Sequence, residues 1–119
     1  MLLMAYLITL APKWRNANLY LRSIVTNDTT QPDIEQSLTS LIDTVRIKAT
    51  QDVIILPEDK SVVEVMHETS KDADLVFVGM MTPEEGQEVE CATRLIQLVE
   101  KLPSTVLVRN SGPFEGQLL

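Results

Sequence analysis

The 119-residue sequence has few of the side chains that most often build chemical sites. It contains one cysteine, Cys91, and one histidine, His67. A single cysteine excludes a disulfide within the chain, and one cysteine with one histidine is too few for a zinc site. Basic residues are also scarce, since 10 Lys and Arg stand against 17 Asp and Glu. The net charge of −7 makes nucleic acid and anionic membrane surfaces unexpected partners, because both require clustered basic side chains.

The longest apolar stretch is MLLMAYLITLA, residues 1–11. It predicts a helix that is apolar on nearly every side. A membrane span needs about 20 apolar residues, so we expect no direct membrane insertion by this segment. A helix without a polar face is normally buried, so the segment favours packing on a partner beyond this chain. The alternative is an outer helix of the domain that leaves one face loose.

Strand and helix signals alternate after Pro12. Apolar runs predict parallel strands, and capping signals such as Ser61 with Glu64, or Thr82 with Pro83, predict helix starts. We therefore expect one α/β domain over residues 1–119. It consists of an N-terminal helix (1–11), a small doubly wound parallel sheet of order 2-1-3-4 with helices on both faces, and a tail (110–119). The expected strands are residues 19–26, 52–56, 74–79 and 105–109, with helices between them.

Apolar residues at helical spacing predict the buried face of each connecting helix. The face of the first is expected to comprise Ile34, Leu38, Leu41, Ile42 and Val45. The face of the second is expected to comprise Val62, Val65, Met66 and Thr69. The face of the third is expected to comprise Val89, Ala92, Leu95, Ile96 and Val99.

Ligands of doubly wound sheets bind at the carboxyl ends of the strands, where the strand order reverses. In this chain that place is the pair of loops after Val25 and after Val78. A ligand there would meet Thr26, Asn27, Gly79 and Thr82. Only Gly79 and Gly86 lie in the second loop, so neither the Rossmann nor the P-loop fingerprint is present.

Four glutamates lie at the expected start of the last helix, where a nucleotide phosphate would be held: Glu84, Glu85, Glu88 and Glu90. The helix dipole favours carboxylates in the first turn. A phosphate about 8 Å from one of them would be repelled by about 2 kcal/mol at an effective dielectric constant near 20. Several such repulsions act on a nucleotide, so we do not expect tight nucleotide binding. Consecutive glutamates on a helix splay apart, so we do not expect a metal site either.

The remaining candidates for chemistry are isolated. His67 lies in a charged helical segment and is expected at the surface, and Cys91 is expected to serve packing. Asp72 and Asp74 favour a turn before the third strand rather than paired acid–base chemistry. Trp14 is expected to anchor the segment between the first helix and the first strand, with an interface role as the alternative. No catalytic constellation emerges, so we do not expect an enzyme.

Four segments in order, KWRNANLYLRSIV, LTSLIDTVRIKA, DADLVFVGMMTPEEG and LPSTVLVRNSGPFEGQLL, give the chain a family resemblance. From Pro12 to the end it resembles the C-terminal cytoplasmic domain of cation-chloride cotransporters, and most closely the prokaryotic Na-K-Cl type. The most specific parts are Trp14 with Arg15, Arg46 with Ile47, and Leu102-Pro103 followed by VLVR.

The resemblance implies a universal-stress-protein-like fold and a regulatory and dimerisation role on the cytoplasmic face of the membrane. Electroneutral movement of Cl⁻ with Na⁺ or K⁺ would be done by membrane helices that are absent from this chain. ATP-binding members of the stress-protein fold carry a glycine-rich segment, and this chain lacks its Gly-Ser part, so no cofactor is expected. The alternative is a free-standing universal-stress-like protein that binds a nucleotide or another small molecule.

The resemblance also explains the apolar N-terminal helix, which would pack against the preceding half of the cytoplasmic region. The implied partners are that half, a second copy of the chain in a homodimer, and the transmembrane domain of the same transporter. The expected interface residues are Leu3, Leu7, Leu10, Trp14, Val106 and Val108.

Overall fold

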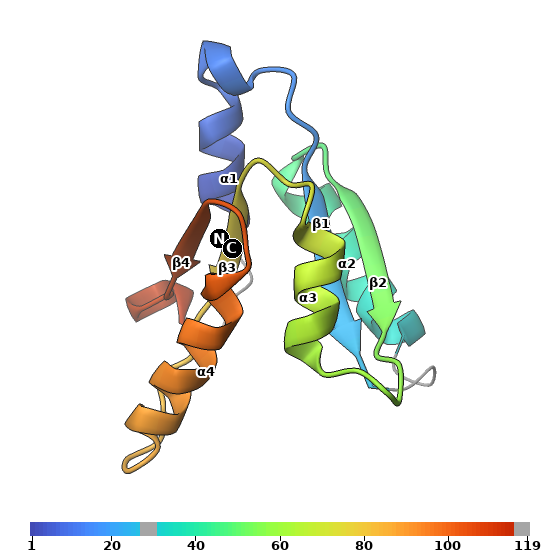
Figure 1. The fold of residues 1–119 in the computed structure, drawn as a ribbon. Coiled ribbons are helices and arrows are strands. Elements are labelled where there is room, and N and C mark those ends of the chain that lie inside the picture. Colours follow the sequence, from blue (N-terminus) through green and yellow to red (C-terminus); the bar gives the residue numbers. More distant parts are fainter. Residues whose placement is uncertain (27–30, 116–119) are drawn as a thin grey trace. The chain divides into compact units, whose positions relative to one another are not determined.

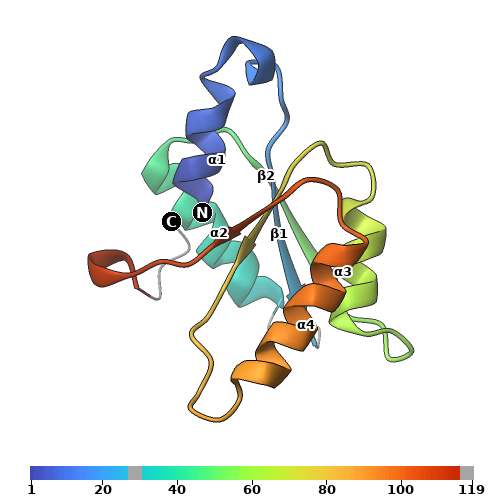
Figure 2. The same ribbon diagram turned by 60° about the vertical axis from the view of Figure 1, so that its left-hand side comes forward.

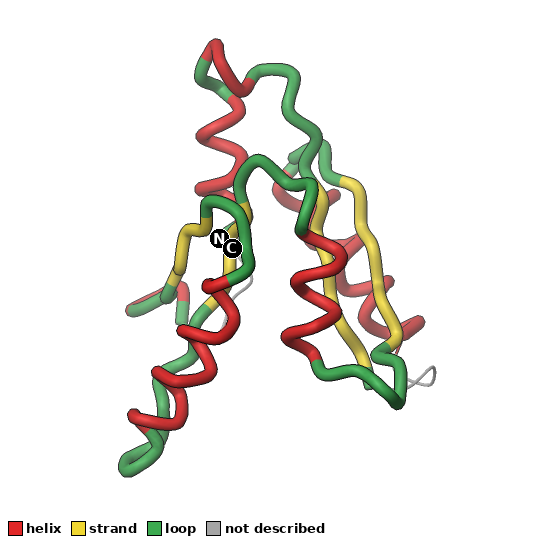
Figure 3. Tube along the Cα trace, viewed as in Figure 1, coloured by secondary structure: helices red, strands yellow, loops and turns green. Residues whose placement is uncertain are grey.

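The computed structural model describes residues 1–26 and 31–115 and divides into two compact units (Figure 1). One unit is Leu2–Ser61, and the other is Met1 together with the chain from Val62 onward. Helices and strands alternate along the chain (Figure 3), which confirms the predicted α/β class. The described strands form two parallel two-stranded sheets, one in each unit, and not the single four-stranded sheet of order 2-1-3-4.

The unit Leu2–Ser61 holds the first parallel pair. Its strands lie in register from Tyr20 opposite Thr50 to Val25 opposite Ile55. The connecting helix packs against both strands (Figure 2), as expected for a β-α-β crossover. The elements are α1 (Leu2–Thr9), a 3₁₀ turn η1 (Pro12–Trp14), β1 (Tyr20–Val25), α2 (Gln31–Val45) and β2 (Thr50–Ile55).

The predicted inner face of α2 is confirmed. Leu38 is 4% exposed, and the other four members of the face are half-buried. Leu21, Val25 and Ile47 are also buried. The helix ends where Arg46 takes a φ of 54°, since a left-handed residue cannot continue a right-handed helix. The helical spacing of apolar residues was sufficient to predict this face, because α2 covers a sheet whose two strands directly precede and follow it in the sequence.

The other unit holds the second parallel pair, from Val76 opposite Thr105 to Gly79 opposite Val108. The helix α3 begins directly after the predicted cap Ser61 and packs against α4 (Figure 2). The elements are α3 (Val62–Ser70), β3 (Val76–Gly79), α4 (Glu88–Glu100), β4 (Thr105–Val108) and a 3₁₀ turn η2 (Gly112–Phe114). The turn η2 lies within the segment predicted as a tail.

The predicted start of α4 at Thr82 and Pro83 is wrong. The helix begins at Glu88, after Gln87, whose side chain makes no capping hydrogen bond. The cause is Gly86, which has a φ of +88°. This backbone conformation is open to glycine but is incompatible with a helical turn.

The predicted inner faces of α3 and α4 are each partly wrong. In α3 Val65 is 3% exposed, but Val62 in the first turn is 45% exposed. In α4 Val89 and Ile96 are 81% and 65% exposed. The buried or half-buried side chains of α4 are Cys91, Leu95, Leu98 and Val99. The buried side is therefore rotated from the predicted one, because α4 packs against α3, a contact that its own sequence does not encode.

Candidate functional site

The candidate ligand position divides between the two units. Thr26 directly follows β1 and is exposed, while Asn27 lies outside the described residues. In the other unit Gly79 is the last residue of β3, and Thr82 is exposed in the loop that follows. The structure thus places Thr26 and Gly79 at the carboxyl ends of parallel strands and Thr82 in the loop after β3, and it describes the two strand ends separately.

The side chain of Met1 lies beside Gly79 in the same unit. A Cβ atom added at Gly79 would lie 3.6 Å from the Met1 Sδ and 3.9 Å from its Cε. Burial lowers the pKa of the Met1 α-amino group. A ligand that approached the backbone at the end of β3 would therefore have to displace an apolar thioether.

The four glutamates are not equivalent in the structure. Glu84 and Glu85 precede the helix, whereas Glu88 and Glu90 occupy the first turn of α4. Only the latter two gain from the helix dipole, by about 0.3–1 kcal/mol each. All four are exposed, and Glu90 forms an ion pair with Arg94 one turn later. Within residues 1–26 and 31–115 no group of three or more His, Cys, Asp or Glu is placed to hold a metal ion.

His67 is the polar residue that the sequence reasoning misplaced. It is half-buried, and its Nε2 donates a hydrogen bond to the backbone carbonyl of Leu98 over 2.7 Å. A carbonyl oxygen only accepts, so Nε2 carries the hydrogen. Leu98 lies in the last turn of α4, where backbone carbonyls have no partner further along the helix. His67 thus joins α3 to the carboxyl end of α4.

A signal for this contact was present in the sequence. Val63, His67 and Ser70 follow helical spacing, and all three are buried or half-buried in the structure. The neighbouring charges in MHETSKD had favoured a surface position. Cys91 is a half-buried free thiol on α4, in keeping with the predicted packing role, and Asp72 lies in a turn after α3 with Asp74 exposed nearby.

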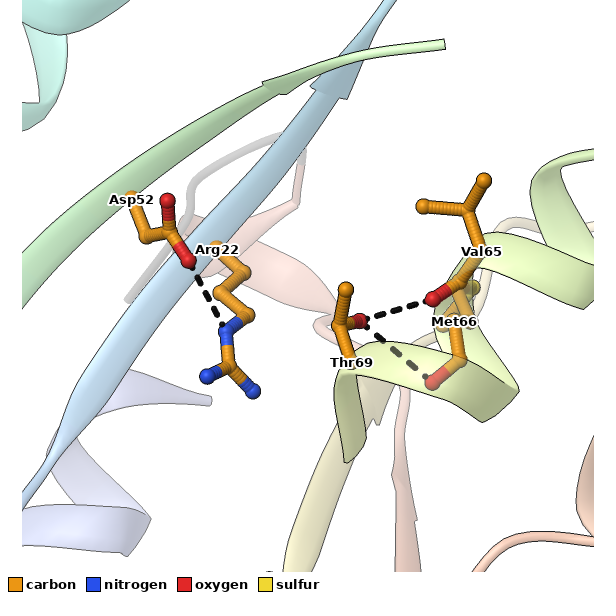
Figure 4. Close-up of polar contacts among 5 residues, drawn as sticks. All are labelled: Arg22, Asp52, Val65, Met66 and Thr69. Atoms are coloured by element: carbon orange, nitrogen blue, oxygen red, sulfur yellow. Dashed lines mark hydrogen bonds and ion pairs between the residues drawn. The ribbon is translucent and has the colours of Figure 1, made fainter. Parts of the chain in front are cut away.

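A polar cluster on the sheet of the first unit was not anticipated. Arg22 and Asp52 are register partners on β1 and β2, and the Arg22 Nε lies 3.2 Å from the Asp52 Oδ2 (Figure 4). The Arg22 guanidinium also lies 5.2 Å from the centre of the Tyr20 ring. Both charged side chains are partly exposed, at 32% and 46%. An ion pair in this setting contributes about 0.2–1 kcal/mol, so the cluster supports the sheet and supplies no reactive group.

Of the predicted interface residues, those of α1 are the most accessible. Leu3, Leu7 and Leu10 are 48%, 53% and 57% exposed, and Met4 beside them is 45% exposed. We call these four residues the apolar row of α1, of which Leu10 lies in the turn directly after the helix. Leu2 is buried, so the helix leaves one side open to solvent. Trp14, in η1, and Val106 and Val108, in β4, are half-buried.

The α-helices of residues 1–26 and 31–115 are between 8 and 15 residues long. In this part of the chain no helix is both long enough and apolar enough to cross a bilayer. The chain as a whole was then compared with known proteins. No protein-family model, curated protein or solved structure matches it.

Proposed function

We propose that the chain is a non-catalytic assembly and regulatory domain of a cation-chloride cotransporter, located on the cytoplasmic face of the membrane. Transport itself would be done by membrane helices outside this chain. The proposal is supported by the ordered sequence resemblance from Pro12 to the end. The observation that carries the assembly role is the apolar row of α1, whose four large exposed side chains lie on a helix without a single charge and on the turn directly after it.

Burying an exposed leucine or methionine side chain contributes about 1.5–3 kcal/mol when burial is complete. The members of the row are about half exposed, so together they offer several kcal/mol to a partner with an apolar surface. Contiguous exposed apolar side chains of this kind mark interaction sites. The partners that we propose are the preceding half of the cytoplasmic region and a second copy of the chain.

We further propose that in the assembled domain the four strands form one sheet of order 2-1-3-4. This order requires three neighbouring pairs, and the parallel pairs β1–β2 and β3–β4 are two of them. The third, β1 beside β3, is the proposed step. Backbone NOEs between residues of Leu21–Val25 and Val76–Gly79 would support it. Their absence in the folded chain, with the other two sets of cross-strand NOEs present, would refute it.

The assembly role can be tested with a photo-crosslinking amino acid at Leu7 in the protein expressed in its own cells. We expect crosslinks to the same transporter polypeptide, either to its preceding cytoplasmic segment or to a second copy. The matched control is the same crosslinker at Gln36, which is exposed on α2 and polar in nature. Crosslinks to unrelated soluble proteins, or equal products from both positions, would contradict the proposal.

The competing function is a free-standing universal-stress-like protein that binds a nucleotide. The exposed threonines after β1 and β3 are its support. The thioether beside Gly79 and the acidic loop before α4 count against it. A nucleotide at 100 times its Kd would stabilise the fold by about 2.7 kcal/mol. A clear rise in melting temperature with millimolar Mg-ATP would therefore favour this function over the assembly role.

A further inference from the structure

The charges of the unit Leu2–Ser61 are divided between the two ends of its sheet. Among the residues that the structure describes, the amino end, where β1 and β2 both begin, carries four cations and one carboxylate, Asp43. The carboxyl end carries four carboxylates and one cation, Lys60. The four carboxylates are Asp33, Glu35, Glu58 and Asp59. We call the four cations of the amino end the basic end of the first unit: Lys13, Arg15, Arg46 and Lys48.

The topology of the β-α-β unit gathers the basic end from two separate segments. One segment is η1 with the turn after it, which leads into β1, and the other connects α2 to β2. Since the strands are parallel and α2 runs back between them, both segments lie at the end where the strands begin (Figure 1). A backbone hydrogen bond from Thr50 N to Leu19 O, 2.8 Å long, joins the two segments there. The arrangement is therefore set within a single unit.

The side chains of the basic end are available to an anionic partner. All four are exposed, and none forms an ion pair within residues 1–26 and 31–115. Arg46 also takes a φ of 54°, a conformation that glycine adopts with less strain. A strained backbone at such a position indicates a use for the side chain that the residue carries.

We propose that the basic end of the first unit lies on the headgroups of an anionic lipid bilayer. An anionic surface was unexpected from the net charge of the whole chain, but the fold separates the charges and presents the cations together. This inference rests on the membrane location in the proposed function and assigns the surface that faces the membrane. It leaves the apolar row of α1 to the protein partners proposed above.

The spread of the cations and their neighbours favour a bilayer over other anionic partners. The cations come from two connections and do not converge on one point, as they would around a single phosphate, so an extended surface fits them better. Trp14 lies between Lys13 and Arg15, directly after the uncharged helix α1. Tryptophan and basic residues at the end of an apolar helix are typical of the membrane interface. Trp14 is half-buried, which does not favour the stacking of nucleic-acid bases on its ring.

The acidic end of the unit does not cancel this attraction. The strand β1 has six residues and spans about 17 Å, which is about twice the Debye length of about 8 Å at physiological ionic strength. Each cation near an anionic bilayer strengthens binding by about fivefold. With four cations and Asp43 opposing them, binding should be weak and reversible for the isolated chain. In a protein already held at the membrane, the contact becomes intramolecular and a weak surface suffices.

Flotation of the full chain with lipid vesicles tests the partner. We expect binding to phosphatidylcholine vesicles that contain about one-third phosphatidylglycerol, no binding to pure phosphatidylcholine, and release of the chain in 0.5 M salt. Trp14 is the only tryptophan, so its fluorescence emission should shift to the blue as the anionic vesicles are added. A chain that binds both kinds of vesicle equally or neither, or that binds duplex DNA more tightly than the anionic vesicles, would overturn the inference.

Charge variants test the surface. The double variant Lys13→Gln/Lys48→Gln should weaken vesicle binding by about 25-fold. The matched control is Lys71→Gln/Lys101→Gln, which makes the same change in net charge at two exposed positions of the other unit and should have little effect. Equal losses from the two double variants would overturn the inference, because binding would then follow net charge alone.

Arg46→Gly separates the side chain from the fold. Glycine suits the left-handed conformation of this position, so the variant should melt no lower than the wild type while binding the anionic vesicles about fivefold more weakly. Unchanged binding by this variant would remove Arg46 from the surface and contradict the proposed site. The proposed function would survive a failure of the vesicle experiments, since the crosslinks at Leu7 test it separately.

Discussion

Replacing His67 by alanine should loosen the contact between α3 and α4. The substitution removes the 2.7 Å hydrogen bond to the carbonyl of Leu98 and the half-buried ring that makes it. A hydrogen bond of this kind contributes about 0.5–1.5 kcal/mol net. Water can replace part of it at a half-buried site, so we expect a loss of about 1 kcal/mol in the free energy of unfolding. For a domain of this size that corresponds to a fall of roughly 4 °C in Tm.

Three matched variants separate the hydrogen bond from the loss of the ring. His67→Gln keeps a nitrogen donor at nearly the reach of Nε2 and should restore much of the stability. His67→Asn places its donor too close to the backbone of α3 and should behave like alanine. Gln97→Ala changes an exposed polar residue on α4 and should remain within about 0.5 kcal/mol of the wild type.

Chemical denaturation gives the free energies, and amide hydrogen exchange gives their location. The exchange of backbone amides in α3 and in the last turn of α4 should accelerate in the alanine variant, with β1 and β2 changed less. Equal stability of the alanine variant and the wild type would refute the reasoning. So would equal effects of the glutamine and asparagine variants, since only the length of the side chain distinguishes them.

Three further predictions concern the core, a turn and the sheet. Val65→Ala should cost about 1.5–2.5 kcal/mol in a denaturant titration, while Val62→Ala on the same helix should cost less than about 0.5 kcal/mol, because their exposures are 3% and 45%; equal costs would contradict the packing of α3. Gly86→Ala should destabilise the fold by about 1 kcal/mol in thermal melts, since the φ of +88° strains any other residue, and an unchanged Tm would count against this turn. A double-mutant cycle on Arg22 and Asp52 should give a coupling of about 0.2–1 kcal/mol that shrinks in 1 M salt, and a salt-independent coupling would exclude an ionic origin.

The sequence predicted best what depends on near neighbours. The alternation of strands and helices, the inner face of α2 and the start of α3 after Ser61 follow from local spacing and capping, and the structure contains all of them. The predicted start of α4 was wrong because Thr82 and Pro83 have the sequence pattern of a helix start, whereas the helix begins at Glu88. The backbone of Gly86 prevents a helix from passing through it, and a sequence shows only that glycine permits such a conformation.

Contacts between elements were the least predictable part. The partner of His67 lies 31 residues away on another helix, so its local charged surroundings pointed to the surface. Of the face predicted for α4, only Leu95 and Val99 are half-buried, and the buried Leu98 was not part of it, because the position of α3 decides which side of α4 is covered. For the candidate ligand site, the loops were located by the rule for parallel strands, whereas the occupation of the space beside Gly79 by Met1 is a tertiary contact.

The measurement that most directly tests the central proposal is a fractionation of cells that express this protein, with detection by an antibody raised against this domain. A cotransporter domain predicts a membrane-bound band several times heavier than the 13.3 kDa of the chain, and this band should resist extraction by salt and alkali. A soluble band near 13.3 kDa would contradict the proposal and would turn attention to a small-molecule ligand at the ends of β1 and β3.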